Sequence, residues 1–168
     1  MIVEIQEVNH ILAWRAYEPD GLWFSADYNL PDLAIVDTSS MEQAMFLQKL
    51  FKQIEKINPG FFSTYFGLHI KTETNFPVKW GFGTSSTLLN NLAQWAGIDI
   101  FELFYSVSKL SGYDVACATS NKPILFQRDI SSKPHVQKVD FNKSFIEHMY
   151  LVFLGMKKST EQHINQFL

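Results

Sequence analysis

The feature that most constrains this chain is a short run, residues 77–87, in which two glycines and four hydroxyl residues stand directly before an apolar helical pattern. Glycine lets backbone N–H groups turn toward a ligand without a side chain in the way. A helix N-terminus adds unpaired N–H groups and a partial positive charge. The run therefore predicts a loop that leads into a helix and binds an anion, most often phosphate.

The loop lacks the Gly-Lys-Ser/Thr ending of a Walker A motif, so it indicates another class of phosphate binder. A simpler interpretation is an ordinary connection between a strand and a helix with a serine cap.

Length and charge narrow the function classes. The 168 residues suffice for one domain with a core, and we expect a single domain over residues 1–168. The net charge of −3 gives no overall field that would attract nucleic acid, so we expect no nucleic-acid partner. The single cysteine, Cys117, fits a reducing compartment. We find no signal-peptide pattern and no apolar run of ~18 residues, and we therefore expect a cytoplasmic protein that does not enter a membrane.

Apolar alternation predicts a β-hairpin of residues 12–17 and 22–30 around a Glu-Pro-Asp-Gly turn. Further strands are predicted at residues 2–8, 66–74, 124–127, 136–141 and 150–155. Helical periodicity predicts a helix that follows Ser39 and Glu42, which have capping-box spacing, and stops at residues 58–60.

A second helix is predicted from near Ser85 to a Gly97 cap. A third is predicted from Asp99 and Glu102 to about Lys109. Strands and helices are mixed along the chain, which favours an α+β fold.

A second motif, Ser-Gly-Tyr-Asp-Val-Ala at residues 111–116, follows the third predicted helix. Asp114 alone would be a turn residue more often than a catalytic base. The ordered pair of motifs is more specific than either one, and with it the chain resembles the GHMP kinases, the superfamily of galactose, homoserine, mevalonate and phosphomevalonate kinases. The loop resembles that family's Pro-x-x-x-Gly-Leu-Gly-Ser-Ser motif, with Phe82 for Leu and Thr84 for the first Ser. Residues 111–116 resemble the Ser-Gly-x-Asp-x-Ala segment of the mevalonate-kinase branch, and residues 112–116 are similar to the Gly-Tyr-Asp-Ile-Ala (GYDIA) signature of a bacterial subgroup.

The resemblance runs over nearly the whole chain and implies an N-terminal GHMP-kinase domain with a ribosomal-protein-like two-layer βαβ fold. It implies an ATP- and Mg²⁺-dependent kinase that phosphorylates a hydroxyl or phosphate group of a small molecule. Asp114 would be the catalytic base, and Ser85 the hydroxyl that contacts Mg²⁺. Ser111, Gly112 and Lys109 would lie on the substrate side. The ATP phosphates would lie against Gly81, Gly83, Thr84, Ser85 and Ser86.

The chain also departs from the family pattern. Nothing in residues 1–8 resembles the family's first strand, which carries Lys and Gly-Glu, and the chain shows no glycine-rich third motif or C-terminal domain. Leu103 occupies the position of the metal-binding Glu of mevalonate kinases. The neighbouring Glu102 is a second Mg²⁺ candidate, although a helix would point it about 100° away and capping is its simpler role. Lys109 stands where the family has small residues, so it would narrow the substrate pocket or add a cation.

A non-catalytic protein is the alternative: a truncated kinase homologue that acts as a binding or interaction domain. In either case the absent strands would leave sheet edges and apolar surface exposed, so we expect a homo-oligomer formed through those edges.

Overall fold

A computed structural model describes residues 1–6, 10–30, 32–128, 133–140, 144, 147–150 and 152. The mixture of helices and strands confirms the α+β class. The helices are α1 (Met41–Ile57), α2 (Thr84–Ala96), α3 (Ile100–Val107) and α4 (Tyr113–Ala118), with short 3₁₀ turns at Phe62–Thr64 and Val78–Trp80. The strands are β1 (Ile2–Gln6), β2 (Ile11–Glu18), β3 (Gly21–Asn29), β4 (Ile35–Thr38), β5 (Gly67–Glu73), β6 (Ile124–Gln127) and β7 (His135–Lys138).

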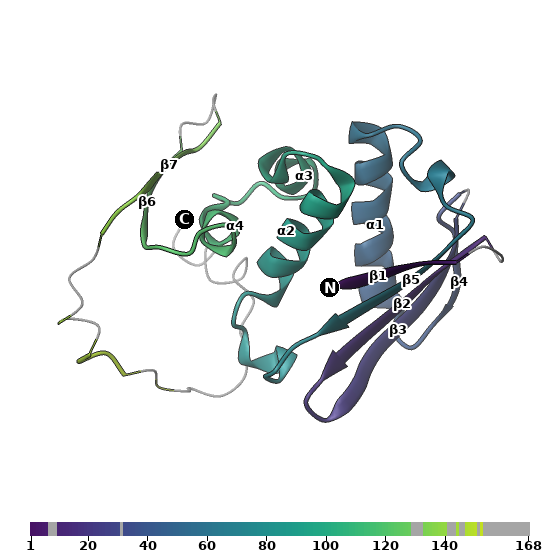
Figure 1. Cartoon of the computed structure of the whole chain (residues 1–168), viewed down its shortest axis with the longest axis horizontal. Coiled ribbons are helices and arrows are strands. Elements are labelled where there is room, and N and C mark those ends of the chain that lie inside the picture. The colour runs from purple at the N-terminus through teal and green to yellow at the C-terminus, as the bar shows by residue number, and fades with distance from the viewer. Residues whose placement is uncertain are drawn as a thin grey trace.

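Five strands form one mixed sheet in the order β1-β5-β2-β3-β4 (Figure 1). The predicted β2–β3 hairpin is confirmed, with Glu18 paired to Gly21 at its closed end. β5 is inserted between β1 and β2 and runs parallel to β2, whereas the other neighbours are antiparallel. A parallel pair needs a crossover connection, and α1 lies on that crossover.

The hydrophobic core lies between one face of the sheet and α1. Phe51 of α1 packs against the rings of Trp14 and Tyr28, with ring centroids 5.9 and 5.3 Å away. The buried Tyr28 hydroxyl donates a hydrogen bond of 3.0 Å to the Ala44 carbonyl of α1. Residues spaced three or four apart lie on one face of α1 and are buried in this core: Ala44, Leu47, Leu50, Phe51 and Ile54.

The opposite face of the sheet is polar and carries ion pairs. Arg15 of β2 and Asp27 of β3 approach to 2.6 Å, and Lys71 and Glu73 of β5 approach to 2.8 Å. This sheet therefore has one dry face and one face toward solvent, as antiparallel-rich sheets commonly do.

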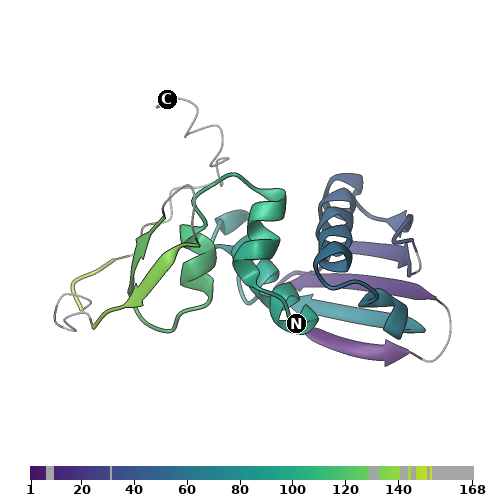
Figure 2. The same cartoon turned by 90° about the horizontal axis from the view of Figure 1, so that it is seen from above.

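Helices α2, α3 and α4 form a group beside α1, and the β6–β7 hairpin extends beyond α4 (Figure 2). Leu92, Leu103 and Val115 are fully buried where these helices meet. Phe126 of β6 packs against Tyr113 of α4 with ring centroids 5.7 Å apart. Among the helices described, none is long and apolar enough to cross a bilayer.

Some boundaries differ from the sequence prediction. The N-cap of α1 is Ser40, whose side chain contacts Gln43, so the predicted pair Ser39 and Glu42 is wrong by one residue. The Ser39 hydroxyl instead accepts a 2.9 Å hydrogen bond from the Ser25 N–H of β3. The predicted Gly97 cap of α2 is confirmed, with φ of 65°.

Two elements were not predicted, the short strand β4 and the six-residue helix α4. Residues 150 and 152 are not in a strand, and the rest of the predicted strand at 150–155 lies outside the described residues, as do residues 7–8 and 141.

Candidate functional site

The glycine loop begins with the 3₁₀ turn Val78–Trp80 and ends at the first residue of α2. Gly81 and Gly83 both have left-handed backbones, with φ of 76° and 78°. Gly83 is the N-cap of α2, so the serine cap considered above does not form. A glycine cap has no side chain to accept the first N–H groups of the helix. The first N–H groups of α2 therefore have no side-chain cap, and such a helix N-terminus suits the binding of an anion.

Ser86, in the first turn of α2, joins the loop to the second motif. Its side chain is only 4% exposed, and its hydroxyl donates a 3.0 Å hydrogen bond to Oδ2 of Asp114. Asp114 is an exposed residue in the first turn of α4, so its carboxylate is held at Oδ2 and remains open to solvent. The structure therefore brings together two predicted site residues that are 28 positions apart, Ser86 and Asp114.

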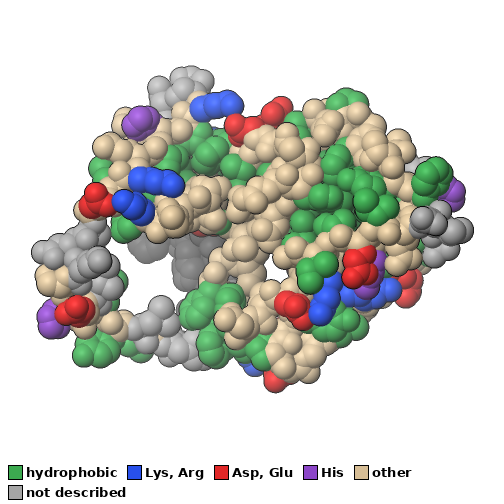
Figure 3. Space-filling model, in the orientation of Figure 1, with side chains coloured by type: hydrophobic (Ala, Val, Ile, Leu, Met, Phe, Trp, Pro, Cys, Tyr) green, Lys and Arg blue, Asp and Glu red, His purple; other side chains and the backbone are tan. Residues whose placement is uncertain are grey.

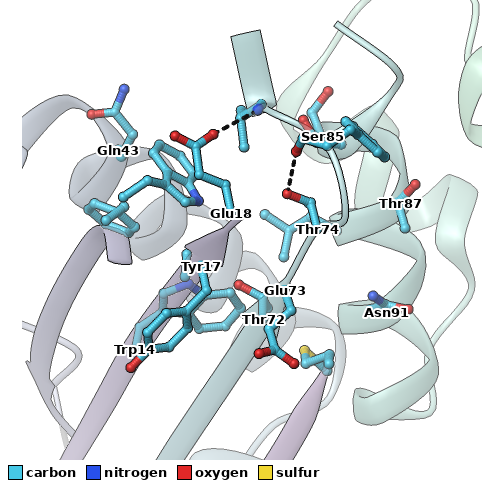
Figure 4. Close-up of a pocket in the computed structure, with 18 of the residues that line it drawn as sticks. Trp14, Tyr17, Glu18, Gln43, Thr72, Glu73, Thr74, Ser85, Thr87 and Asn91 are labelled. Carbon is cyan, nitrogen blue, oxygen red and sulfur yellow. Dashed lines mark hydrogen bonds between the residues drawn. The ribbon is translucent and has the colours of Figure 1, made fainter. Parts of the chain in front are cut away.

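Ser85 has a different environment from Ser86. It lines a cavity of about 810 Å³ between the sheet, α1 and α2, whereas Ser86 and Asp114 do not line it. Figure 4 shows Ser85, Thr87 and Asn91 of α2 on one side of this cavity, with Trp14 of β2 and Gln43 of α1 across from them. The molecule is hollowed beside α2 in the space-filling view (Figure 3). Thr84 and Ser85 are thus the predicted phosphate-loop residues that border both the helix N-terminus and the cavity.

The cavity is mainly apolar, with several aromatic residues in its lining, and two glutamates, Glu18 and Glu73, are among the residues that border it. Glu18 Oε2 accepts a 3.0 Å hydrogen bond from the Val78 N–H, which ties the β2–β3 hairpin to the start of the glycine loop (Figure 4). Glu73 pairs with Lys71 at its edge. The aromatic lining residues are Trp14, Tyr17, Trp23, Phe24, Phe46, Phe76 and Phe82.

The sequence places Glu18 in a predicted turn and does not indicate its hydrogen bond to the glycine loop. A glutamate at the closed end of a hairpin carries no local signal of its distant partner, since Val78 follows it by 60 positions. The neighbouring Thr74 hydroxyl donates to the Phe76 carbonyl at 2.7 Å and further shapes the approach to the loop (Figure 4).

The residues predicted on the substrate side build the turn that precedes α4. Gly112 is the N-cap of α4 and has φ of 83°. The Ser111 hydroxyl accepts a hydrogen bond of 3.3 Å from the Tyr113 N–H. Lys109 is exposed and lies just before this turn. Ser111 and Gly112 therefore determine where α4 starts, and through it where Asp114 lies.

The metal candidates are not gathered into a cluster. Glu102 is exposed in the first turn of α3, where its N–H donates to Asp99 Oδ1 at 3.1 Å, and Leu103 is fully buried. Asp99 is the N-cap of α3, as predicted. Within the described ranges, no group of three acidic, histidine or cysteine residues is suited to a metal ion. Ser85 lies in the first turn of α2, whereas Glu102 lies just beyond the other end of that helix, so the two are not placed to share one ion. Magnesium often takes only one or two protein ligands beside substrate phosphates, so Ser85 stays the candidate ligand at the loop.

Comparisons with protein-family models, with curated proteins and with solved structures give no match for this chain. The residues and geometry of the site, together with the resemblance of its two motifs, are therefore the basis for its function.

Proposed function

We propose that this protein is a GHMP-type kinase that transfers the γ-phosphoryl group of ATP to a hydroxyl or phosphate group of a small molecule. The observation that carries the proposal is the Ser86–Asp114 hydrogen bond, because it joins the predicted phosphate loop to the predicted base. The donor is the hydroxyl of a buried serine in the first turn of α2, so the bond links the two motifs inside the packed part of the molecule.

The phosphates of ATP would lie at the N-terminus of α2. Gly81 and Gly83 leave room for close approach of the backbone, and the first N–H groups of the helix face the phosphate oxygens. Phosphoryl transfer depends mainly on positioning and on neutralising charge, which preorganised backbone donors provide.

The cavity beside the loop suits the rest of the nucleotide. Its volume of about 810 Å³ is within the usual size for small-molecule sites, and aromatic walls favour a flat apolar base. The charged side chains among its lining residues are those of Glu18 and Glu73, with no lysine or arginine, so the phosphates would stay at its border with α2. Mg²⁺, held in part by the Ser85 hydroxyl, would supply positive charge that no lysine or arginine of the cavity lining provides.

Asp114 would act on the acceptor. Its exposed carboxylate would accept the proton of the acceptor hydroxyl as the oxygen attacks the γ-phosphorus and ADP leaves. The hydrogen bond from Ser86 fixes one carboxylate oxygen and leaves the other for the acceptor.

The test is turnover of Mg·ATP with mevalonate and phosphomevalonate offered as acceptors. We expect Asp114→Asn to lose turnover and still bind Mg·ATP, and Ser85→Ala to weaken the use of Mg·ATP. Asp140→Asn is the matched control, because Asp140 is an exposed carboxylate just after β7, paired with Lys122 at 2.8 Å. Unchanged turnover in Asp114→Asn would remove Asp114 from the role of base.

The alternative is a non-catalytic binding domain. It is supported by the cavity lining, which contains two glutamates and no lysine or arginine. Such a lining also suits an uncharged or cationic ligand. Titration calorimetry and thermal shift with Mg·ATP separate the two: no heat and no shift would favour a binding domain for another ligand.

A further inference from the structure

We infer that Tyr105 and Arg128 are positioning residues that together hold the turn at residues 109–112 and so place the Asp114 carboxylate against Ser86. These two side chains form a clamp on the turn. The clamp rests on contacts in the structure, whereas its role in catalysis rests on the proposed function.

Tyr105 forms the first contact. It lies in the last turns of α3, and its hydroxyl donates a 2.8 Å hydrogen bond to the Ser111 carbonyl. Its ring is fixed by Phe104, whose centroid is 5.2 Å away in an edge-on arrangement. A short, well-anchored donor therefore holds the backbone one residue before the N-cap of α4.

Gly112 shows how closely the turn approaches Tyr105. A Cβ atom at this position would lie 3.0 Å from the Tyr105 hydroxyl and 3.2 Å from a ring carbon of Phe104. Its φ of 83° also disfavours any other residue. The backbone thus rests directly on these two side chains of α3.

Arg128 forms the second contact. It follows β6, and its guanidinium lies over the Tyr105 ring at 4.2 Å from the centroid. It also donates a hydrogen bond to the Leu110 carbonyl in the same turn. Arginine suits this role because its planar group can stack on a ring and donate at its edge. The clamp therefore grips the turn at two carbonyls, those of Leu110 and Ser111.

The position of Asp114 depends on this turn because α4 has only six residues. A helix of that length is not stable by itself, so its first turn lies where its contacts hold it. Asp114 is two residues beyond Gly112, and a displacement of about 1 Å at a catalytic group can cost on the order of 100-fold in rate.

Cys117 provides a readout that needs no activity. It is the only cysteine of the chain, it lies in α4, and it is half-buried. The rate at which Ellman's reagent modifies its thiol reports local opening of α4. We expect Tyr105→Phe and Arg128→Ala to raise that rate at least about threefold. Each substitution removes a contact that holds α4, so local opening of α4 becomes more frequent and exposes the thiol more often.

The kinetic readout separates positioning from general damage. In Tyr105→Phe we expect kcat for Mg·ATP turnover to fall about tenfold or more while the Kd of Mg·ATP stays within about twofold, since the clamp does not touch the glycine loop. Arg128→Lys keeps a donor for the Leu110 carbonyl and should recover part of the loss seen in Arg128→Ala. Tyr65→Phe is the matched control: Tyr65 packs with Phe61 and Trp95 away from the turn and should change neither readout.

The outcomes are distinct. A raised thiol rate together with a selective loss of kcat supports the inference. A wild-type thiol rate in both Tyr105→Phe and Arg128→Ala overturns it, as does a raised thiol rate with unchanged kcat. If the wild-type protein does not turn over Mg·ATP, the proposed function fails, and the thiol rates still decide whether the clamp holds α4.

Discussion

At the scale of single residues, the two adjacent serines of the loop have separate surroundings. Ser85 is exposed and lines the cavity, whereas Ser86 is buried and donates to Asp114. Neighbouring helix positions point about 100° apart, so one α2 turn can serve the cavity with one hydroxyl and α4 with the next.

This difference predicts unequal effects of the same substitution. Ser86→Ala should lower the free energy of unfolding by about 1 to 2 kcal/mol, because it removes a hydrogen bond to a carboxylate from a buried position. Ser85→Ala, at an exposed position, should change it by less than about 0.5 kcal/mol. Urea denaturation measures both, and equal losses would contradict the assignment of the two hydroxyls.

The charge of Asp99 should make the stability of the folded protein depend on pH. Burial pushes the pKa of its carboxyl upward, but hydrogen bonds from Lys133 and from the N–H groups of Glu102 and Phe101 outweigh it, and the net pKa is lowered from 3.8. A carboxyl with a lowered folded pKa contributes stability above its unfolded pKa and loses it as the pH falls through the folded value.

We therefore expect the native protein to lose stability below about pH 4 more steeply than Asp99→Asn, which keeps a capping oxygen but cannot ionise. Urea midpoints measured between pH 3 and pH 7 test this. Parallel curves for the two proteins would show that the Asp99 charge does not matter.

At the scale of elements, α2 has left-handed glycines at both ends, Gly83 with φ of 78° and Gly97 with φ of 65°. A Cβ atom at either position would meet nothing within 4 Å. A side chain added at either glycine would thus lower stability through the same kind of backbone strain. Only Gly83 belongs to the proposed phosphate site.

Gly83→Ala and Gly97→Ala form a matched pair. Each should lose about 1 to 2 kcal/mol of stability from the left-handed backbone. Only Gly83→Ala should also weaken Mg·ATP binding, because its Cβ stands at the helix N-terminus where the phosphates would lie. Calorimetry that finds the same affinity for both variants would argue against a phosphate site at this end of α2.

At the scale of the whole molecule, the sheet has two edges, β1 and β4, among the residues described. Apolar side chains stand exposed on or near them: Ile5 on β1, Val36 on β4, and Phe66 just before β5. Exposed strand edges offer unpaired backbone groups to another chain. Hydrophobic side chains also gather over β1 and α1 on the face shown in Figure 3.

We expect the protein to self-associate through these edges. Sedimentation or light scattering over a range of concentrations should show dimers or larger species, and Ile5→Lys should shift the distribution toward monomer because a charge on an edge strand opposes pairing. Lys138→Glu on β7 is a control that changes charge away from this sheet. A clean monomer at high concentration would refute the expectation.

The sequence by itself determined what depends on neighbouring residues. The β2–β3 hairpin follows from its turn and alternation, the end of α2 follows from Gly97, and the cap of α3 follows from Asp99. It also marked the loop and the Asp114 segment as a pair, because their residue types and order are informative without any contact.

Only the tertiary structure decided which residues meet. The insertion of β5 between β1 and β2, the choice of Ser86 rather than Ser85 as the partner of Asp114, the link from Glu18 to the loop, and the Tyr105–Arg128 clamp all join distant positions. Such contacts arise from how whole elements pack, and the pattern of a short segment does not show which of its side chains touches a distant element. Local chemistry thus indicated the kind of site, and packing of α2 against α4 placed its residues together.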